Sequence, residues 1–260
     1  MHAVNGFKAA LLACAFSITF VLVLAVGALF MVPSWEDIAV NLLSEEMRFS
    51  LRLTMTTGLI SASLVMAFAL PVGYALSRYA FPGRGLVKTI VDLPVAFPEL
   101  VLGLCLLLLF GKTPFGRALS AAGIEFVFTV QGVVVAQFFT ALPYASRILK
   151  STFDYINPRL EFVSRSLGYS QMETFFNVSL PLAKNGILAS TVISFARCIG
   201  TFGTVLILAG GTYMKTEVLP MTLYLNISYG NMGMALTSGI LLTAVSFIAI
   251  YIFERTEAGI

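Results

Sequence analysis

The sequence predicts an all-α integral membrane protein with six transmembrane helices, and three observations carry this prediction. Residues of the AVILMFWYC set make up 58% of the 260 residues, whereas Asp, Glu, Lys and Arg together make up 11%. A soluble domain has about 25% charged residues, so a water-soluble fold of this size could not cover its surface. The mean hydropathy of +0.92 also excludes a disordered chain. The third observation is the length of the apolar stretches.

A helix that crosses about 30 Å of hydrocarbon needs about 20 mostly apolar residues. The stretches that meet this requirement are 11–32, 51–76, 86–110, 126–148, 182–209 and 232–253. We therefore expect residues 1–260 to form a single transmembrane domain. The first stretch is predicted to be a span, because its apolar run is too long for a signal peptide. Segment 33–50 mixes Trp35 with acids and aliphatic residues, which predicts a short helix at the interface.

The basic residues predict the orientation of these spans. Ten of the 16 Lys and Arg residues lie on the side of both termini, five lie on the other side, and Arg197 lies inside a span. Both termini are therefore expected to be cytoplasmic. The net charge of +3 is scattered along the chain, which argues against nucleic-acid binding. Cys14, Cys105 and Cys198 have no Cys or His at ligand spacing, so we expect neither a disulfide nor a metal site.

The long cytoplasmic loop at 150–181 carries helix signals. Asn157 and Pro158 suit a helix start, and Gly168 suits a left-handed end. Ser170 and Glu173 match a capping box that opens a second helix, which is expected to stop near Ser179, ahead of a proline.

The two loop helices mix charged and aromatic side chains that we expect to be exposed. They are Arg159, Glu161, Arg165 and Glu173, with Phe162, Tyr169, Phe175 and Phe176. From the residues alone, an amphipathic connector on the membrane surface and a docking surface for a cytoplasmic partner are equally good interpretations.

The spacing of the loop resembles a known family. Gly168, nine further residues and then Val178–Pro181 are similar to the EAA signature of binding-protein-dependent ABC importers, E-A-A-x3-G-x9-I-x-L-P. The Glu-Ala-Ala positions hold Phe162, Val163 and Ser164, and Glu161 lies one position early. The resemblance implies a type I ABC importer permease fold whose loop docks on an ATPase subunit. The docking and coupling residues that it implies are Glu161, Phe162, Val163, Ser164, Arg165, Gly168, Tyr169, Ser170 and Glu173.

A second stretch indicates which permeases within this family the chain resembles most. Residues 195–203 read FARCIGTFG, which looks like the F-A-R-x-x-G-E-F/Y-G stretch of molybdate and sulfate permeases, with Thr201 in place of Glu. Asp92-Leu93-Pro94, followed by Pro98 and Gly103, is similar to their third span. The resemblance implies a permease for molybdate or tungstate, with sulfate, thiosulfate or another oxyanion as the alternative. It further implies a homodimer in the cell membrane, two ATPase subunits that hold ATP and Mg, and an extracytoplasmic oxyanion-binding protein. No cofactor and no catalytic residue are expected in this chain.

Arg197 is the only basic residue well inside a predicted span. An ion there costs at least about 2.5–3.5 kcal/mol on insertion scales, so Arg197 must face protein, water or a carboxylate. It is interpreted either as a structural pair, for which Glu99 is a candidate, or as a contact for an oxyanion in the translocation path. The candidate path residues are Arg197, Gly200, Thr201, Phe202, Gly203, Pro98 and Glu99. The glycines favour close helix packing over a helix break, and Pro94 and Pro98 are expected to kink the third span.

Rival functions find less support. Gly111-Lys112-Thr113 resembles the end of a P-loop, but Leu106 occupies the position of the required glycine, so no ATP site is expected. A secondary transporter driven by an ion gradient would be expected to carry ionisable residues within its spans and internal repeats. Only Asp92 and Glu99 are candidates for such acidic residues within a span. No catalytic motif supports an intramembrane enzyme.

Overall fold

The computed structural model describes residues 2–258, and regular structure in that range is entirely helical. The first half of the chain contains α1 (His2–Met31), α2 (Trp35–Leu42), α3 (Glu45–Arg78), α4 (Arg84–Ala96), α5 (Glu99–Lys112), α6 (Pro114–Ala121) and α7 (Val130–Tyr155). The second half contains α8 (Pro158–Ser166), α9 (Gln171–Thr174), the π-helical turn η1 (Phe175–Ser179), α10 (Leu180–Leu182), α11 (Lys184–Ile199), α12 (Gly203–Ala209), α13 (Leu219–Ser228) and α14 (Met232–Ala258).

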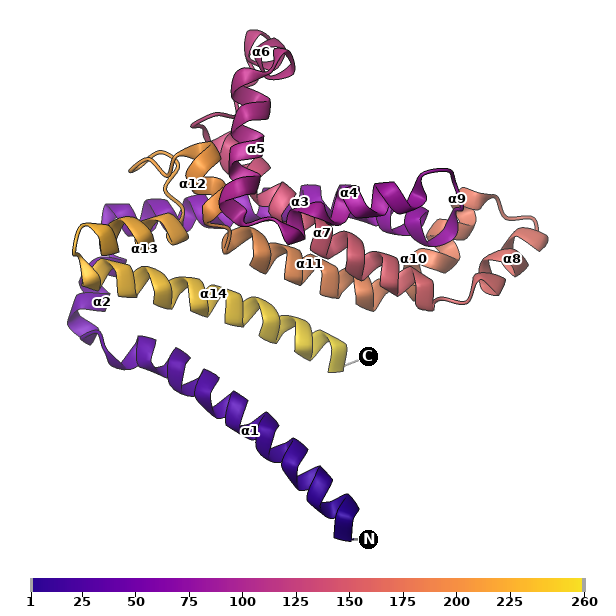
Figure 1. Ribbon diagram of the computed structural model, residues 1–260, viewed down its shortest axis with the longest axis horizontal. Coiled ribbons are helices and arrows are strands. Elements are labelled where there is room, and N and C mark those ends of the chain that lie inside the picture. Colours follow the sequence, from indigo (N-terminus) through magenta and orange to yellow (C-terminus); the bar gives the residue numbers. More distant parts are fainter. Residues whose placement is uncertain (1, 259–260) are drawn as a thin grey trace.

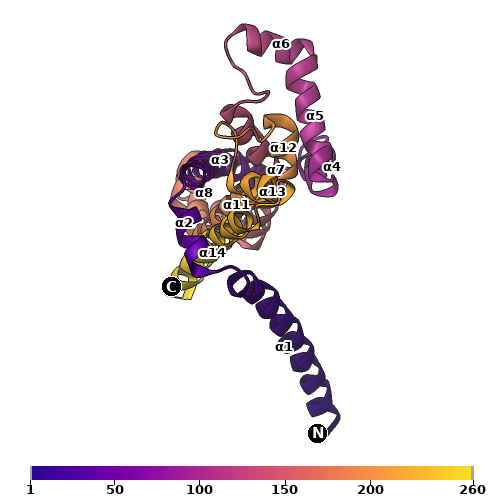
Figure 2. The same ribbon diagram turned by 90° about the vertical axis from the view of Figure 1, so that its left-hand side faces the viewer.

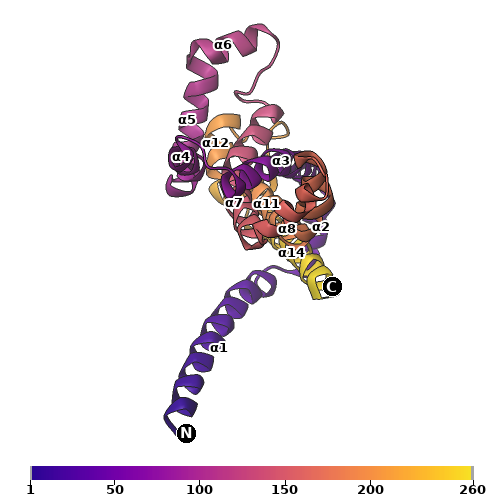
Figure 3. The same ribbon diagram turned by 90° about the vertical axis from the view of Figure 1, so that its right-hand side faces the viewer.

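The long helices form one elongated bundle. Figure 1 shows α3, α4, α7, α11 and α14 running along a common direction, with α8 and α9 at one end and α2 and α13 at the other. Helix α1 splays away from the bundle, and α5 leaves it at a steep angle with α6 at its tip (Figures 2 and 3). The start of α1 and the end of α14 both lie toward the end that carries α8 (Figure 1).

Four helical segments are long and apolar enough to cross a membrane, and two bent helix pairs raise the number to six if each pair is one span. The four are Phe7–Met31, Glu45–Arg78, Val130–Tyr155 and Met232–Ile252. The bent pairs are α4 with α5, at 116°, and Gln171–Leu182 with α11, at 73°. The fold is therefore that of a multi-span helical protein with four to six candidate crossings.

The bundle is organised around the pairing of α3 with α7. Their backbones approach closely at Gly73, where a Cβ atom would lie 2.8 Å from the Leu149 Cβ and 3.0 Å from the Lys150 nitrogen. Buried small residues such as Ala69 and Ala145 continue this contact. Small side chains allow such approach, and van der Waals packing is the main attraction between helices in lipid.

Replacing Gly73 with valine is expected to destabilise the α3–α7 pair by about 1–3 kcal/mol, because the added side chain cannot fit without moving backbone atoms. The measurement is thermal unfolding of the purified protein in detergent. Gly85→Ala is the matched control, since a Cβ atom there meets nothing within 4 Å and alanine favours a helix more than glycine does. An unchanged melting temperature for Gly73→Val would contradict the assigned packing.

The proline kink expected in the third predicted span is a complete helix break. Phe97 ends α4 in an extended conformation, and Pro98 precedes α5 with ψ 138°. A residue before proline avoids the helical region, and proline cannot donate the N–H that a continuous helix needs. Pro94, by contrast, lies within α4.

The predicted fifth span, 182–209, is also interrupted. Helix α11 ends at Ile199, and α12 begins only at Gly203, after three residues that include Gly200. The preference for packing over breaking was therefore wrong at this place, although packing contributes too. A Cβ atom on Gly203 would lie 2.9 Å from the Glu99 Cβ, so the glycine allows two broken helices to meet.

Candidate functional site

The loop between α7 and α11 has the caps that its sequence predicts. The Asn157 side chain accepts a hydrogen bond from the Arg159 nitrogen at 3.0 Å, and Pro158 opens α8. Gly168 follows α8 with φ +99°, a conformation that L side chains rarely adopt. The Ser170 hydroxyl accepts from the Glu173 nitrogen at 3.2 Å, and the Ser170 nitrogen donates to the Glu173 carboxylate at 2.8 Å. This capping box is confirmed.

The Glu173 carboxylate titrates below its ordinary range. The backbone N–H of Ser170 and then the Ser170 hydroxyl lower its pKa from 4.5. A carboxyl whose pKa is lower in the folded loop than in the unfolded chain stabilises the loop at pH values above its unfolded pKa. This contribution is lost as the pH falls through the folded pKa. We expect exchange protection of the Ser170 amide to decline only below pH 4.5, and Glu173→Gln to flatten the profile. Hydrogen exchange measured from pH 3 to pH 7 tests this, and an identical profile in Glu173→Gln would contradict it.

The second loop helix does not stop ahead of Pro181 as predicted. It continues from α9 through η1 into α10, and the direction changes by 73° only between Leu182 and Lys184. A π-helical turn is wider than an α-helical one and has a shifted bonding pattern. The wider turn η1, which precedes Pro181, therefore leaves room for the proline ring. Its shifted hydrogen bonds also tolerate a residue that has no backbone N–H.

Glu161 is buried, which corrects the prediction that it is exposed. Arg78, at the end of α3, donates from Nε to Glu161 Oε1 at 2.8 Å, and the side chains are 9% and 10% exposed. The Ser179 hydroxyl donates to the same oxygen at 2.8 Å, and the Tyr74 hydroxyl lies 3.5 Å from Oε2. One carboxylate thus joins α8 to α3 and to η1. Phe175 is half-buried against Tyr74, with ring centroids 4.8 Å apart.

Sequence reasoning missed Arg78 as a loop-holding residue. Its Nη2 atom also donates to the Ile156 carbonyl at 2.9 Å, so it fixes the start of the loop as well. Neighbouring Ser77 donates to Asp154, which pairs with Lys150. A basic residue at the end of a span was counted only as an orientation signal, and the separation of 83 residues from Glu161 hid the pairing.

The exposed part of the loop mixes large apolar side chains with polar ones. Ser164 is buried and its hydroxyl lies 3.1 Å from the Thr174 hydroxyl, which holds α8 against α9. The exposed large apolar side chains are Leu160, Phe162, Val163, Leu167, Tyr169, Met172 and Phe176. We call these residues the loop tip. Arg165, Gly168, Ser170 and Glu173 are exposed among them. Behind the tip, a cavity of about 140 Å³ lies between α3 and the loop.

A second polar cluster lies where the two broken helices meet. Arg197 Nη2 donates to Glu99 Oε1 at 3.0 Å, so the candidate partner of Arg197 lies beside it. Glu99 Oε2 accepts from the Gly203 nitrogen at 3.0 Å and from the Phe202 nitrogen at 3.4 Å. The Thr204 hydroxyl donates to the Glu99 carbonyl at 3.1 Å. Glu99 therefore fastens the start of α5 to the start of α12.

The remaining candidate path residues surround this pair. Thr201 is buried and its hydroxyl donates to the Arg197 carbonyl at 2.8 Å, so it supports the backbone. The Phe202 ring packs against Tyr224, with centroids 5.1 Å apart. Gly200 ends α11, and Pro98 directly precedes Glu99. The structure brings all seven predicted path residues into one neighbourhood.

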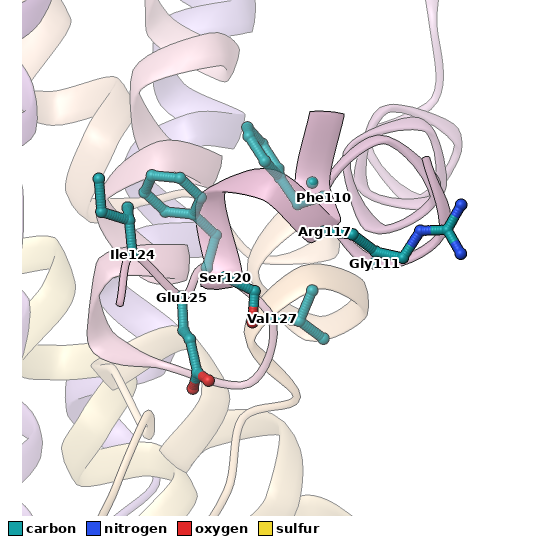
Figure 4. A pocket seen from close by; sticks show the side chains of 9 residues that line it. Phe110, Gly111, Arg117, Ser120, Ile124, Glu125 and Val127 are labelled. Atoms are coloured by element: carbon teal, nitrogen blue, oxygen red, sulfur yellow. The ribbon is translucent and has the colours of Figure 1, made fainter. Parts of the chain in front are cut away.

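A larger cavity of about 320 Å³ lies far from both clusters, between the end of α5, α6 and the segment before α7. Figure 4 shows Arg117 and Glu125 pointing in different directions at its rim. The described residues that line it include none of the site residues predicted from the sequence.

An all-helical bundle with four to six candidate membrane crossings, two interrupted helices and a loop held by a buried ion pair defines a multi-span membrane protein. The chain belongs to the family described as the binding-protein-dependent transport system inner membrane component, which matches residues 66–259. It is thus a multi-pass inner-membrane protein, and its relatives are permease subunits of ABC transporters.

Three relatives with similar sequences are permease proteins named for molybdenum, for molybdate/tungstate and for sulfate. The chain is 35% identical to a probable molybdenum ABC transporter permease of Haloferax volcanii, covering 81% of this chain and 75% of the relative. It is 32% identical to the molybdate/tungstate permease protein WtpB of Methanocaldococcus jannaschii, covering 71% of each. It is 29% identical to the sulfate permease protein CysW of Synechococcus elongatus, covering 84% and 77%.

Solved structures share the fold. A chain of a bacterial alginate ABC transporter, in complex with its alginate-bound periplasmic protein, matches with a TM-score of 0.76 at 17% identity, covering 94% of this chain and 93% of that one. A chain of the MetNI methionine ABC transporter in an inward-facing conformation matches with a TM-score of 0.62 at 20% identity, covering 82% and 97%. At these identities the likeness extends to the fold alone.

Proposed function

We propose that the chain is the permease subunit of an ATP-driven importer for molybdate or tungstate. The observation that carries the proposal is the loop tip, an apolar surface held to the bundle by the buried pair of Glu161 and Arg78. An amphipathic connector that only rests on the membrane surface would need no buried ion pair. Family membership and the relatives named for molybdate, tungstate and sulfate support this substrate class.

The proposed assembly is a symmetric homodimer with six spans per chain, of which the third contains α4 and α5 and the fifth contains α11 and α12. Two ATPase subunits, which hold the ATP and Mg, dock on the two loop tips, one on each permease chain. An extracytoplasmic binding protein delivers the oxyanion. Both termini are cytoplasmic in this arrangement, which agrees with the start of α1 and the end of α14 lying toward the α8 end (Figure 1) and with the distribution of basic residues.

The mechanism follows from how the loop is held. Closure of the ATPase pair on ATP draws the two loops together, and the loop moves as a rigid unit because its helices are capped and its carboxylate is buried. Glu161 transmits this motion to α3 through Arg78, and η1 transmits it to α11. The loop is joined directly to the fourth and fifth predicted spans, and its contact with α3 adds the second span to them. The two bundles rotate and the translocation path between them opens outward, and ADP release turns it inward again.

Substrate selection is assigned to the binding protein. A path with strong cationic sites would trap a dianion, whereas transport needs contacts that form and release readily. Arg197, the one basic residue deep within the predicted spans, is already paired with a carboxylate, which suits such a weak contact.

The test is uptake into liposomes that contain the permease with its partner ATPase and oxyanion-binding protein. ATP-dependent uptake of radiolabelled molybdate that tungstate suppresses and excess sulfate does not is the expected result. Uptake of sulfate instead would keep the mechanism and overturn the substrate. Absence of ATP-dependent uptake of all three anions would overturn the proposal.

A further inference from the structure

Arg197 has donors that the protein leaves unused. A guanidinium carries five N–H donors in a planar fork. Only Nη2 donates to Glu99, and the Nε atom is buried without a hydrogen-bond partner among the described residues. The Tyr144 ring lies under the guanidinium, 5.0 Å from Cζ. The side of the fork formed by Nε and Nη2 therefore holds one carboxylate oxygen and leaves the Nε donor unused.

The pair is accessible although it lies between membrane helices. The Arg197 side chain is 36% exposed and that of Glu99 is 29% exposed. Intramembrane ionisable groups face a bundle interior or a water-filled cavity, because exposing them to lipid is costly. The open face of this pair is consequently directed at water or at a second copy of the chain.

Glu99 does not depend on Arg197 alone. Its second oxygen accepts from the backbone nitrogens of Gly203 and Phe202. If Arg197 turned to another anion, this carboxylate would keep both backbone donors, and the guanidinium would keep its contact with Tyr144. The exchange thus takes from Glu99 only the hydrogen bond at Oε1, and the carboxylate stays bound to the backbone through Oε2.

We propose that Glu99 is an exchangeable internal counter-ion, and that the translocated tetrahedral dianion displaces it from the Arg197 fork during passage. The inference rests on the proposed function and adds a defined contact to it. Arginine suits this role because its fork binds two oxygens of an oxyanion at once, whereas lysine acts as a point charge. Glu99 restores the resting pair afterwards and prevents retention of the anion.

The decisive variant is Glu99→Gln, which keeps the shape of the side chain and removes its charge. With its competitor gone, Arg197 should retain the dianion. We expect equilibrium binding of radiolabelled molybdate to the purified permease to tighten about tenfold, the factor that about 1.4 kcal/mol produces. ATP-driven uptake by Glu99→Gln should be severalfold slower than uptake by the unmodified protein. Asp92→Asn is the matched control: it removes the other carboxylate of the same predicted span, which pairs with Arg147.

The outcomes separate this inference from the proposed function. If the unmodified protein imports no oxyanion, the proposed function fails. If it does, and Glu99→Gln binds and transports molybdate like Asp92→Asn, the counter-ion role is overturned. If Glu99→Gln does not assemble, the variant Arg197→Lys tests the role instead, because it keeps the positive charge and loses the planar fork. Uptake per ATP hydrolysed should then fall severalfold, and an unchanged value would overturn the role.

Discussion

Replacing Glu161 with alanine is expected to abolish ATP-driven uptake while the transmembrane bundle stays assembled. The change leaves Arg78 buried without its carboxylate, and breaking a buried pair in this way costs about 3–5 kcal/mol. The loop loses its connections to α3 and to η1 together. Uptake in liposomes is the main measurement, and limited proteolysis between residues 156 and 184 reports whether the loop has come loose.

Two further variants make this expectation specific. Glu36→Ala removes an exposed acid from α2, at the opposite end of the bundle, and should leave uptake unchanged. Combining Glu161→Leu with Arg78→Met removes both charges, so neither side chain is left unpaired and protease resistance should partly return. Normal uptake by Glu161→Ala would show that the buried pair does not connect the loop to the bundle.

Gly168→Arg is expected to uncouple ATP hydrolysis from transport, lowering uptake at least tenfold with the protein still folded. Space is available there, since a Cβ atom meets nothing within 4 Å. The φ of +99°, however, costs a non-glycine residue about 1–3 kcal/mol, and the new cation stands within the apolar loop tip. The measurement compares uptake with ATP hydrolysis in the same liposomes.

Gly168→Asn separates backbone strain from the blocked surface, because asparagine tolerates positive φ better than other residues. This variant should retain most of the uptake that Gly168→Arg loses. Equal loss in both would assign the effect to strain in the turn. Full transport by Gly168→Arg would remove the loop tip as the docking surface.

Local features of the loop could be predicted because their causes are local. The Asn157 cap, the Gly168 turn and the capping box at Ser170 each depend on residues within a few positions, and the structure shows all three. The burial of Glu161 could not be predicted, since it depends on Arg78, which lies 83 residues away. A charged residue in a cytoplasmic loop is usually solvated, and only the tertiary arrangement overrides that expectation.

The broken spans also depend on contacts between residues that are far apart in the sequence, which local patterns do not predict. Pro98 predicted a kink, because proline restricts its predecessor and lacks an N–H. The full bend of 116° also involves Glu99, which bonds to the backbone of a helix more than 100 residues later. Gly203 signalled close packing, and only the structure shows that its partner is Glu99. Hydropathy counted the spans as uninterrupted stretches, since both halves of each broken span are apolar.

The energy source for transport is the central claim, and one comparison tests it most directly. Liposomes with the permease and binding protein are assembled with the active ATPase, with a hydrolysis-deficient ATPase, or with none, and each is also given an imposed proton or sodium gradient. The account predicts oxyanion uptake only with the active ATPase and ATP, whatever the gradient. Uptake that follows a gradient without ATP hydrolysis would contradict it and assign the chain to the ion-coupled transporters.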